Sequence, residues 1–217
     1  MASDAPLVTP VVGENGLPVV SEEEQKKKVA KATKFVAFVM IIPRMLFSAI
    51  AFGVYKFTGL NSPFDMSKLG WTYLAIWLLS VLTFLLNFYP MVQKAKLDLK
   101  GNIRANMMFF KAIGTAGPMV ALEEDGAIGA YNRANRSLFH FNEYLGSCVP
   151  CILASGLTFP FPVFVLTAVL FVGRVLHQVG YSFAYGGHAK GFGLSMIAMV
   201  SLEGLTLISA LSLFGFI

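Results

Sequence analysis

Five apolar stretches, each about as long as a membrane-spanning helix, divide the chain. A transmembrane helix needs roughly 20 predominantly apolar residues, and charged residues are scarce within all five stretches. The pattern therefore predicts an all-α integral membrane bundle with no soluble domain beyond it. The stretches are Phe35–Phe57, Trp71–Val92, Leu138–Pro160, Val163–Tyr185 and Phe192–Ile217.

The segments between these stretches carry separate expectations. Residues 1–34 lack the basic start and apolar core of a secretory signal, and we expect a flexible polar and basic tail. The loop 93–132 is longer than the usual connection of about 2–8 residues between helices. Its middle, Ala105–Ala116, mixes apolar residues with Lys111, which predicts a short interfacial helix that breaks at Gly117-Pro118.

Composition excludes a soluble domain. The chain is 56% hydrophobic and 13% charged, whereas soluble domains carry about 25% charged residues. The net charge of +5 is concentrated in particular loops, which is typical of a topology signal and does not indicate a nucleic-acid partner.

The basic residues predict the orientation of the chain. If each stretch crosses once, three basic clusters fall on one side and only Lys56 and Lys68 on the other. The positive-inside rule then places the N-terminus and the loop 93–132 on the cytoplasmic, stromal or matrix side. The clusters are Lys26, Lys27, Lys28, Lys31 and Lys34; Lys94, Lys96, Lys100, Arg104 and Lys111; and Lys190.

Two successive apolar stretches each carry three polar side chains at helical spacing. Residues three and four apart share one face of a helix. A charged side chain near the bilayer centre costs about 2.5–3.5 kcal/mol, so we expect both faces to converge on a protein-lined or water-filled polar site. The two sets are Arg136, His140 and Glu143, and Arg174, His177 and Tyr181.

Both sets lie in motifs that resemble one family. Residues 133–144, RANRSLFHFNEY, resemble the signature R-A-x-R-A-H-x-N-x-x-E in the second helix of the membrane-associated eicosanoid and glutathione metabolism (MAPEG) family. Residues 173–181, GRVLHQVGY, resemble its third-helix pattern G-R-x-x-Y-x-x-G-Y. The closest likeness is to the type-three microsomal glutathione transferases. The resemblance implies a four-helix domain over residues 71–217, with the helix 35–57 additional to it.

The resemblance also implies a ligand. Family members are trimers that bind glutathione between subunits near the cytoplasmic side, in the endoplasmic reticulum or another organelle membrane. Glutathione has two carboxylates and one ammonium, so its site needs cations and an anion. By resemblance, Arg136, Arg174 and Lys96 (an Arg in most members) would bind the carboxylates, and Glu143 the ammonium. The implied glutathione site comprises Lys96, Arg136, His140, Glu143, Tyr144, Arg174, His177 and Tyr181.

All three histidines depart from the family pattern. His140 replaces an Asn, His177 a Tyr, and His188 the Arg that activates the thiol in the leukotriene-synthesising branch. In one interpretation His188 is the catalytic residue, favouring the thiolate as a cation or removing the proton as a general base. In the other, glutathione chemistry is lost and the histidines fill hydrogen bonds or bind a metal or tetrapyrrole. We predict no metal site.

The sequence thus supports two functions of different classes. The first is a glutathione transferase or peroxidase acting on lipophilic electrophiles or lipid hydroperoxides, with glutathione as co-substrate and membrane lipid as its surroundings. The second is a non-catalytic accessory subunit of a larger membrane complex. Within the helices, Glu203 is expected to pair with another helix and Arg44 to face protein. Cys148 and Cys151 form a C-x-x-C, interpreted as buried thiols or as a redox pair.

Overall fold

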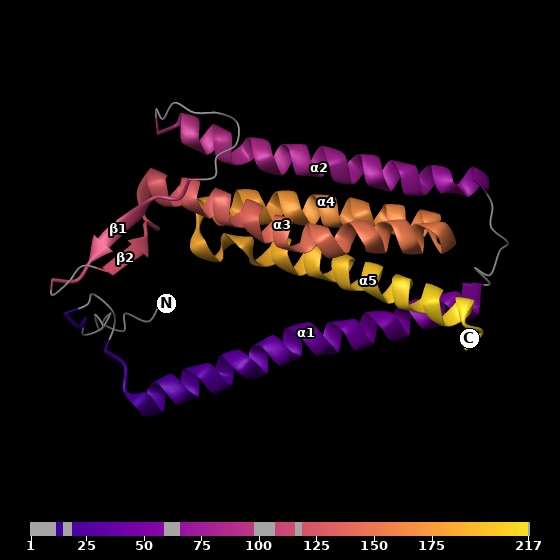
Figure 1. Cartoon of the computed structure of the whole chain (residues 1–217), viewed down its shortest axis with the longest axis horizontal. Coiled ribbons are helices and arrows are strands. Elements are labelled where there is room, and N and C mark those ends of the chain that lie inside the picture. Colours follow the sequence, from indigo (N-terminus) through magenta and orange to yellow (C-terminus); the bar gives the residue numbers. More distant parts are fainter. Residues whose placement is uncertain (1–11, 15–18, 59–65, 98–106, 116–118, 217) are drawn as a thin grey trace, which may run out of the picture.

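The chain forms an antiparallel helical bundle with a short β-hairpin at one end (Figure 1). The computed structural model describes residues 12–14, 19–58, 66–97, 107–115 and 119–216. The all-α membrane bundle predicted from the sequence is confirmed. Its elements are α1 (Glu22–Thr58), α2 (Gly70–Ala95), β1 (Phe110–Ile113), β2 (Met119–Leu122), α3 (Gly126–Thr158), α4 (Pro160–Phe183) and α5 (Ala189–Leu213), with 3₁₀ turns at Met66–Leu69 and Tyr185–His188.

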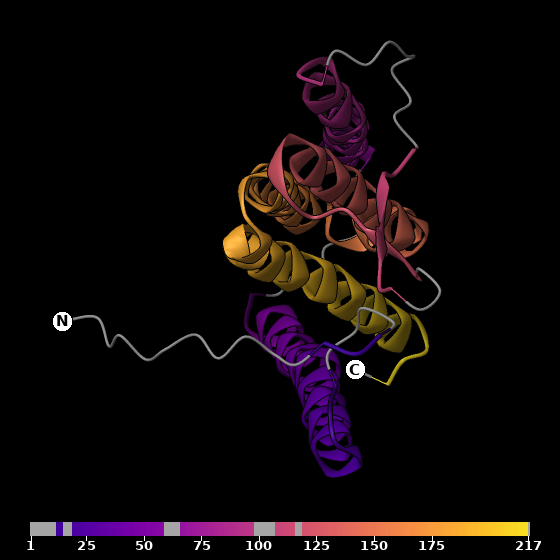
Figure 2. The same ribbon diagram turned by 90° about the vertical axis from the view of Figure 1, so that its left-hand side faces the viewer.

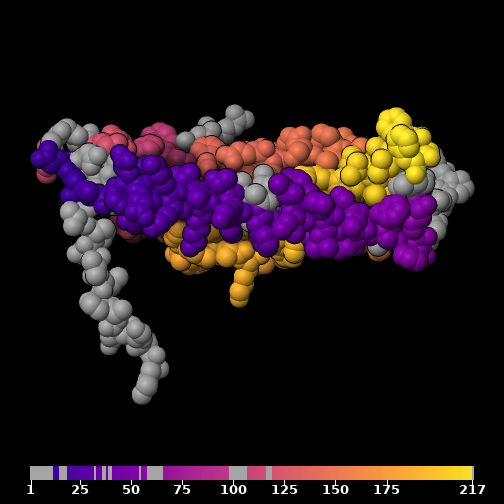
Figure 3. Space-filling model, turned by 90° about the horizontal axis from the view of Figure 1, so that it is seen from below, coloured from indigo at the N-terminus to yellow at the C-terminus, as the bar shows by residue number. Residues whose placement is uncertain are grey.

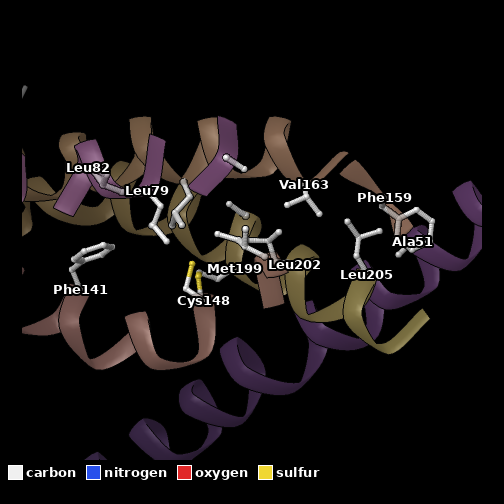
Figure 4. Packing of buried hydrophobic residues seen from close by; sticks show 14 of the residues in the cluster. Ala51, Leu79, Leu82, Phe141, Cys148, Phe159, Val163, Met199, Leu202 and Leu205 are labelled. Atoms are coloured by element: carbon white, nitrogen blue, oxygen red, sulfur yellow. The ribbon is translucent and has the colours of Figure 1, made fainter. Parts of the chain in front are cut away.

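The helices are arranged in layers. Seen end-on, α2 lies on the pair formed by α3 and α4, α5 lies on the opposite side of that pair, and α1 packs outside α5 (Figure 2). Buried apolar side chains from all five helices form one core, which includes Leu82, Phe141, Val163 and Leu202 (Figure 4). The four helices α2–α5 thus form the main body, and α1 is attached to one face of it.

Within the described residues, three segments are long and apolar enough to cross a membrane by length and composition, namely Met66–Ala95, Pro160–Phe183 and Tyr185–Leu213. Because α2 and α4 run in the same direction, α3 must cross back between them (Figure 1). Large apolar side chains on the outer face of α2 are exposed, as expected for lipid contact: Tyr73, Trp77 and Phe84 are 60–70% exposed.

The first helix begins earlier than the apolar stretch. The basic residues assigned to a flexible tail are helical from Glu22 onward. Ser21 Oγ accepts a hydrogen bond from Glu24 N at 3.3 Å, and Glu23–Lys27 and Glu24–Lys28 form ion pairs one turn apart. A capping hydroxyl, an acidic first turn and such pairs stabilise a helix without any apolar face, which is why hydropathy missed its start.

The interfacial helix expected at Ala105–Ala116 is wrong over the described residues, because β1 pairs with β2 in an antiparallel hairpin. The expected break at Gly117-Pro118 lies outside them. Asn132 joins the hairpin to α3: its Nδ2 donates to Phe109 O and Glu123 O at 2.8 Å, and its Oδ1 accepts from Phe109 N at 2.9 Å. α3 begins at Gly126, within the predicted loop 93–132, so the connection between α2 and α3 is shorter than predicted.

Two buried side chains satisfy carbonyl groups that prolines leave without a donor. Pro90 cannot donate to the Leu86 carbonyl of α2, and Gln178 Nε2 of α4 donates to it at 3.0 Å. Pro160 likewise cannot donate to Gly156, whose carbonyl accepts from Thr72 Oγ1 at 2.7 Å. In a membrane such groups have no water to bind, so these contacts fix how α2 sits on α3 and α4.

α1 is attached to α5 by polar contacts within the apolar layer. Arg44 contacts Glu203 with two nitrogens, Nε to Oε2 at 2.8 Å and Nη2 to Oε1 at 3.1 Å. Further along, Tyr55 Oη lies 2.8 Å from Ser212 Oγ. The expected pairing of Glu203 with another helix, and of Arg44 with protein, is confirmed. In the space-filling view α1 runs along the molecule in front of α5 (Figure 3).

Candidate functional site

The structure brings the three histidines together between α3, α4 and the start of α5. The rings of His140 and His177 stack with centroids 5.5 Å apart and planes 24° apart. The ring of His188 lies 5.6 Å from that of His177. The ring centroid of Phe192 lies 5.9, 6.4 and 6.5 Å from those of His140, His177 and His188, respectively. Because these histidines are far apart in the sequence, spacing alone did not predict that their rings form a single aromatic cluster.

Close backbone approach explains how His188 reaches this cluster. A Cβ added to Gly180 would lie 2.2 Å from Gly187 O, and one added to Gly191 would lie 2.1 Å from His177 N. No side chain fits in either place, so glycine allows the chain to turn tightly from α4 into α5. The tight turn holds His188 against the end of α4 that carries His177.

The cluster forms one wall of an open pocket of about 190 Å³, here called the histidine pocket. Arg136 and Glu143 lie on the same face of α3, with Arg136 Nη1 3.4 Å from Glu143 Oε1. More than half of each of these two side chains is exposed. The pocket is lined by Arg136, His140, His177, Tyr181, Tyr185, His188 and Phe192.

The hydrogen bond of His188 defines its proton-accepting atom. His188 Nδ1 lies 2.6 Å from the carbonyl oxygen of Tyr185. A carbonyl oxygen can only accept, so Nδ1 carries the proton and the neutral ring has an unprotonated Nε2. His188 is one of the residues that line the pocket.

Arg174 lies behind this pocket, in the seam between α3 and α4. It is 3% exposed, and its Nη2 donates to the Ser137 carbonyl at 2.8 Å. Its Nη1 donates to His140 Nδ1 at 3.1 Å, and its guanidinium lies 5.4 Å from the Phe141 ring centroid. Arg174 lines a second, water-sized cavity of about 10 Å³, together with Tyr144 and Cys148 among others.

The other members of the implied site are divided between these regions. His177 Nδ1 shares a 2.7 Å hydrogen bond with Ser137 Oγ. Tyr144 contacts His140 edge-on, with centroids 4.9 Å apart, whereas Tyr181 lines the histidine pocket. Lys96 lies elsewhere, in a pocket between α2, α3 and the end of α4.

Sequence reasoning missed several residues that build the site. Ser137 contacts both Arg174 and His177, yet an isolated serine in an apolar helix gave no signal. Phe192 was indistinguishable from lipid-facing phenylalanines. Arg133 belongs to the recognised motif but had no assigned role; its Nε and Nη2 donate to the carbonyls of Tyr181 and Ser182, at 2.9 and 3.0 Å. A cation at the end of α4 stabilises that terminus.

The structure also bears on metal binding and on the chemistry of the two cysteines. Across the described ranges, no three His, Cys, Asp or Glu side chains converge in a way that suits a metal ion. Cys148 is buried, Cys151 is half-buried, and both are free thiols.

The fold and the pocket together define the class: an integral membrane helical bundle with a polar pocket built from two successive helices and a tight turn. The MAPEG family model matches residues 69–211, and the chain belongs to this family. The match begins just before α2, so α1 lies outside it. Members of the family use glutathione and commonly form trimers. No curated protein and no solved structure gives a significant match.

Proposed function

We propose that the protein is a membrane-bound glutathione transferase or peroxidase, of the kind found among type-three microsomal glutathione transferases. The observation that carries this proposal is the histidine pocket, which is lined by both His188 and Arg136, the latter in contact with Glu143. The substrates are lipophilic electrophiles or lipid hydroperoxides, which concentrate in the bilayer around the pocket.

The charges at the mouth of the pocket match those of glutathione. Arg136 binds a carboxylate through two parallel hydrogen bonds, and Glu143 binds the ammonium. Their mutual contact is long and exposed, and such pairs contribute only about 0–1 kcal/mol, so a ligand with both charges replaces it at little cost. The hydroxyl groups of Tyr181 and Tyr185 on the pocket wall are available to the peptide groups.

His188 acts as the base in the reaction. Its Nε2 accepts the thiol proton, and the thiolate sulfur attacks an electrophilic carbon, forming a C–S bond while the leaving group departs with the bonding electrons. With a hydroperoxide, the thiolate attacks an oxygen, the O–O bond breaks and an alcohol forms. A second glutathione then converts the resulting sulfenic acid into glutathione disulfide and water.

Arg174 and Tyr144 lie behind the pocket and contact His140, which is on its wall. Arg174 donates to His140 Nδ1, which fixes that ring as an acceptor at Nδ1 and leaves its Nε2 protonated when neutral. Ser137 holds His177 on the same wall. We therefore propose that Arg174 is a positioning residue for glutathione binding, and that Lys96 takes part from a neighbouring subunit or not at all.

The position of the pocket suits its co-substrate. The turn Tyr185–His188, which contributes two residues to the pocket, lies at the end of the bundle that carries the hairpin and the end of α2, where the basic clusters predict the cytoplasmic, stromal or matrix side (Figure 1). Glutathione would enter from that side and the second substrate from the bilayer. A homotrimer in the endoplasmic reticulum or another organelle membrane completes the proposal.

A turnover assay tests the proposal. The full-length protein in lipid nanodiscs is mixed with glutathione and either an activated aryl chloride or a fatty-acid hydroperoxide, and the thioether or glutathione disulfide is quantified. We expect product above the uncatalysed rate, lost in Glu143→Ala but retained in Lys190→Ala, which removes a charge at the same end of the bundle. Uncatalysed rates with both substrates, from protein that is folded and trimeric, would contradict it.

A second candidate function is that of an accessory subunit, which the attachment of α1 favours. Arg44 and Tyr55 fix one face of α1 to α5, and apolar side chains on other faces of α1 are left exposed. These include Phe35, Phe38, Ile41 and Met45, each 55–69% exposed. Stoichiometric purification with a larger complex from native membrane, without turnover, would favour this role; an active, isolated homotrimer would exclude it.

A further inference from the structure

A second polar pocket lies at the same end of the bundle, separate from the histidine pocket. Its volume is about 190 Å³, and it lies between the end of α2, the first turns of α3 and the end of α4. We call it the lysine pocket; it is lined by Gln93, Lys96, Ala127, Ala130, Ser182 and Phe183.

The polar side chains of this pocket lack partners of their own. Gln93 is only 7% exposed, yet among the described residues its amide has no hydrogen-bond partner. Gln93 lines the pocket, so its amide is available to a ligand there. The ammonium of Lys96 likewise forms no ion pair with any residue the structure describes.

The start of α3 adds positive potential to the pocket. No side chain caps this 33-residue helix, although Asp125 occupies the capping position. Lys111 explains this, because its Nζ lies 2.9 Å from both Asp125 Oδ2 and Glu123 Oε1 and holds these carboxylates on the hairpin. Uncapped N–H groups and the helix dipole favour an anion at this terminus.

Several acceptor groups nearby already have donors. The last carbonyls of α4, on Tyr181 and Ser182, accept hydrogen bonds from Arg133, which also donates to Glu124 O. Ser182 Oγ donates to the Ala130 carbonyl. The Lys96 ammonium, the Gln93 amide and the N-terminus of α3 supply donors at the pocket that suit a tetrahedral oxyanion.

We propose that the lysine pocket binds a phosphate group, carried by an anionic phospholipid or by a soluble phosphate. The pocket is many times larger than the space needed for one water molecule. Phe183, at its edge, is 78% exposed, so an apolar surface adjoins the polar donors. This assignment does not depend on the glutathione chemistry proposed above, and it gives Lys96 a ligand within its own subunit.

Two probes distinguish the sources of the phosphate. Inorganic phosphate is titrated by calorimetry into the full-length protein in phosphatidylcholine nanodiscs, and phosphatidic acid retained by the purified protein is measured by native mass spectrometry. Binding of both identifies a general phosphate site, and retention of phosphatidic acid alone identifies a lipid headgroup site; either supports the proposal.

Three variants keep the test specific. Lys96→Ala should weaken binding roughly tenfold or more, because a charged hydrogen bond is lost. Gln93→Leu should also weaken binding, yet leave the unfolding temperature unchanged or higher, since no hydrogen bond to a described residue is lost. Lys94→Ala, in the same turn of α2, is the matched control and should bind normally. Equal binding in all variants, no binding of either probe, or displacement of phosphate by glutathione would overturn the proposal.

Discussion

Arg136 and Arg174 come from adjacent motifs of one family, yet they lie in opposite environments. The Arg136 side chain is half exposed at the mouth of the histidine pocket, and its contact with Glu143 is 3.4 Å long. Arg174 is 3% exposed and donates to the Ser137 carbonyl and to His140. Residue type and motif therefore do not separate ligand binding from architecture, whereas burial and existing partners do.

The energies involved differ accordingly. An exposed ion pair contributes about 0–1 kcal/mol to stability, so Arg136 is available to a ligand. Each buried hydrogen bond to a charged group contributes about 1.5–3 kcal/mol, so Arg174 stabilises the seam between α3 and α4. The comparison predicts that changes in the pocket alter function without altering stability, and that changes in the seam chiefly lower stability.

The largest functional effect is expected at His188. Substitution His188→Gln removes the base but retains the size of the side chain, and we expect kcat to fall about 10²–10⁴-fold while the Kd for glutathione changes little. His188→Lys separates the two chemical roles, since it supplies a cation but no neutral imidazole. Single-turnover kinetics measures the effect; a rate for His188→Gln within twofold of wild type would remove His188 from the mechanism.

The largest stability effect is expected at Arg174. Arg174→Met leaves His140 Nδ1 without its donor and removes the side-chain hydrogen bond to the Ser137 carbonyl, so we expect the free energy of unfolding to fall by about 2–4 kcal/mol. Thermal unfolding in a fixed detergent measures this. Arg174→Lys keeps the charge but not the planar guanidinium, and its free energy of unfolding should lie between those of wild type and Arg174→Met. An unchanged unfolding temperature for Arg174→Met would break the comparison.

Arg136 should show the opposite behaviour. We expect Arg136→Ala to weaken glutathione binding roughly tenfold or more and to change stability by no more than about 0.5 kcal/mol. Calorimetry and thermal unfolding on the same preparation test both statements together. Lys190→Ala is the control for a general loss of positive charge. If Arg136→Ala unfolds as readily as Arg174→Met, burial does not separate their roles.

The smallest effect concerns the hairpin and pH. Hydrogen bonds to Asp125 and Glu123 raise the pKa of Lys111 above 10.5. A hydrogen bond from Asp125 N, followed by that from Lys111, lowers the pKa of Glu123 below 4.5, and Lys111 lowers that of Asp125 below 3.8.

The carboxylates therefore contribute stability above their ordinary pKa values and lose it as pH falls through the lowered ones. Lys111 contributes below 10.5 and loses its contribution as pH rises through its raised pKa. We expect hydrogen-exchange protection of the hairpin to be constant between about pH 5 and 10 and to decrease outside that range. In Lys111→Gln the decrease in hairpin protection at acidic pH should be smaller. A pH-independent hairpin would contradict the pairing.

The sequence allowed most of the bundle to be predicted, because hydropathy and the positions of charges report directly on membrane helices. It also indicated that polar faces on two helices would meet. It missed the start of α1, where capping and ion pairs replace apolar periodicity, and the hairpin, which depends on Asn132 more than twenty residues from Phe109. These features rest on single side-chain contacts that periodicity does not encode.

The candidate site was harder to predict than the fold. The motifs gave the residues, but spacing on a helix could not tell that Arg174 faces the seam and Arg136 the pocket, since neighbouring helices decide what is buried. Nor could it show that glycine contacts at Gly180 and Gly191 bring His188 against His177. Lys96 shares neither region, because the end of α2 lies across the bundle from the histidines.

The most direct test of the central claim is calorimetric titration of glutathione into the purified full-length protein, from pH 6 to 8.5. We predict a Kd between micromolar and low millimolar, weakened in Arg136→Ala and retained in folded Arg174→Lys. No detectable heat at several millimolar glutathione, from protein that is folded and trimeric, would show that this chain keeps the family fold without its co-substrate.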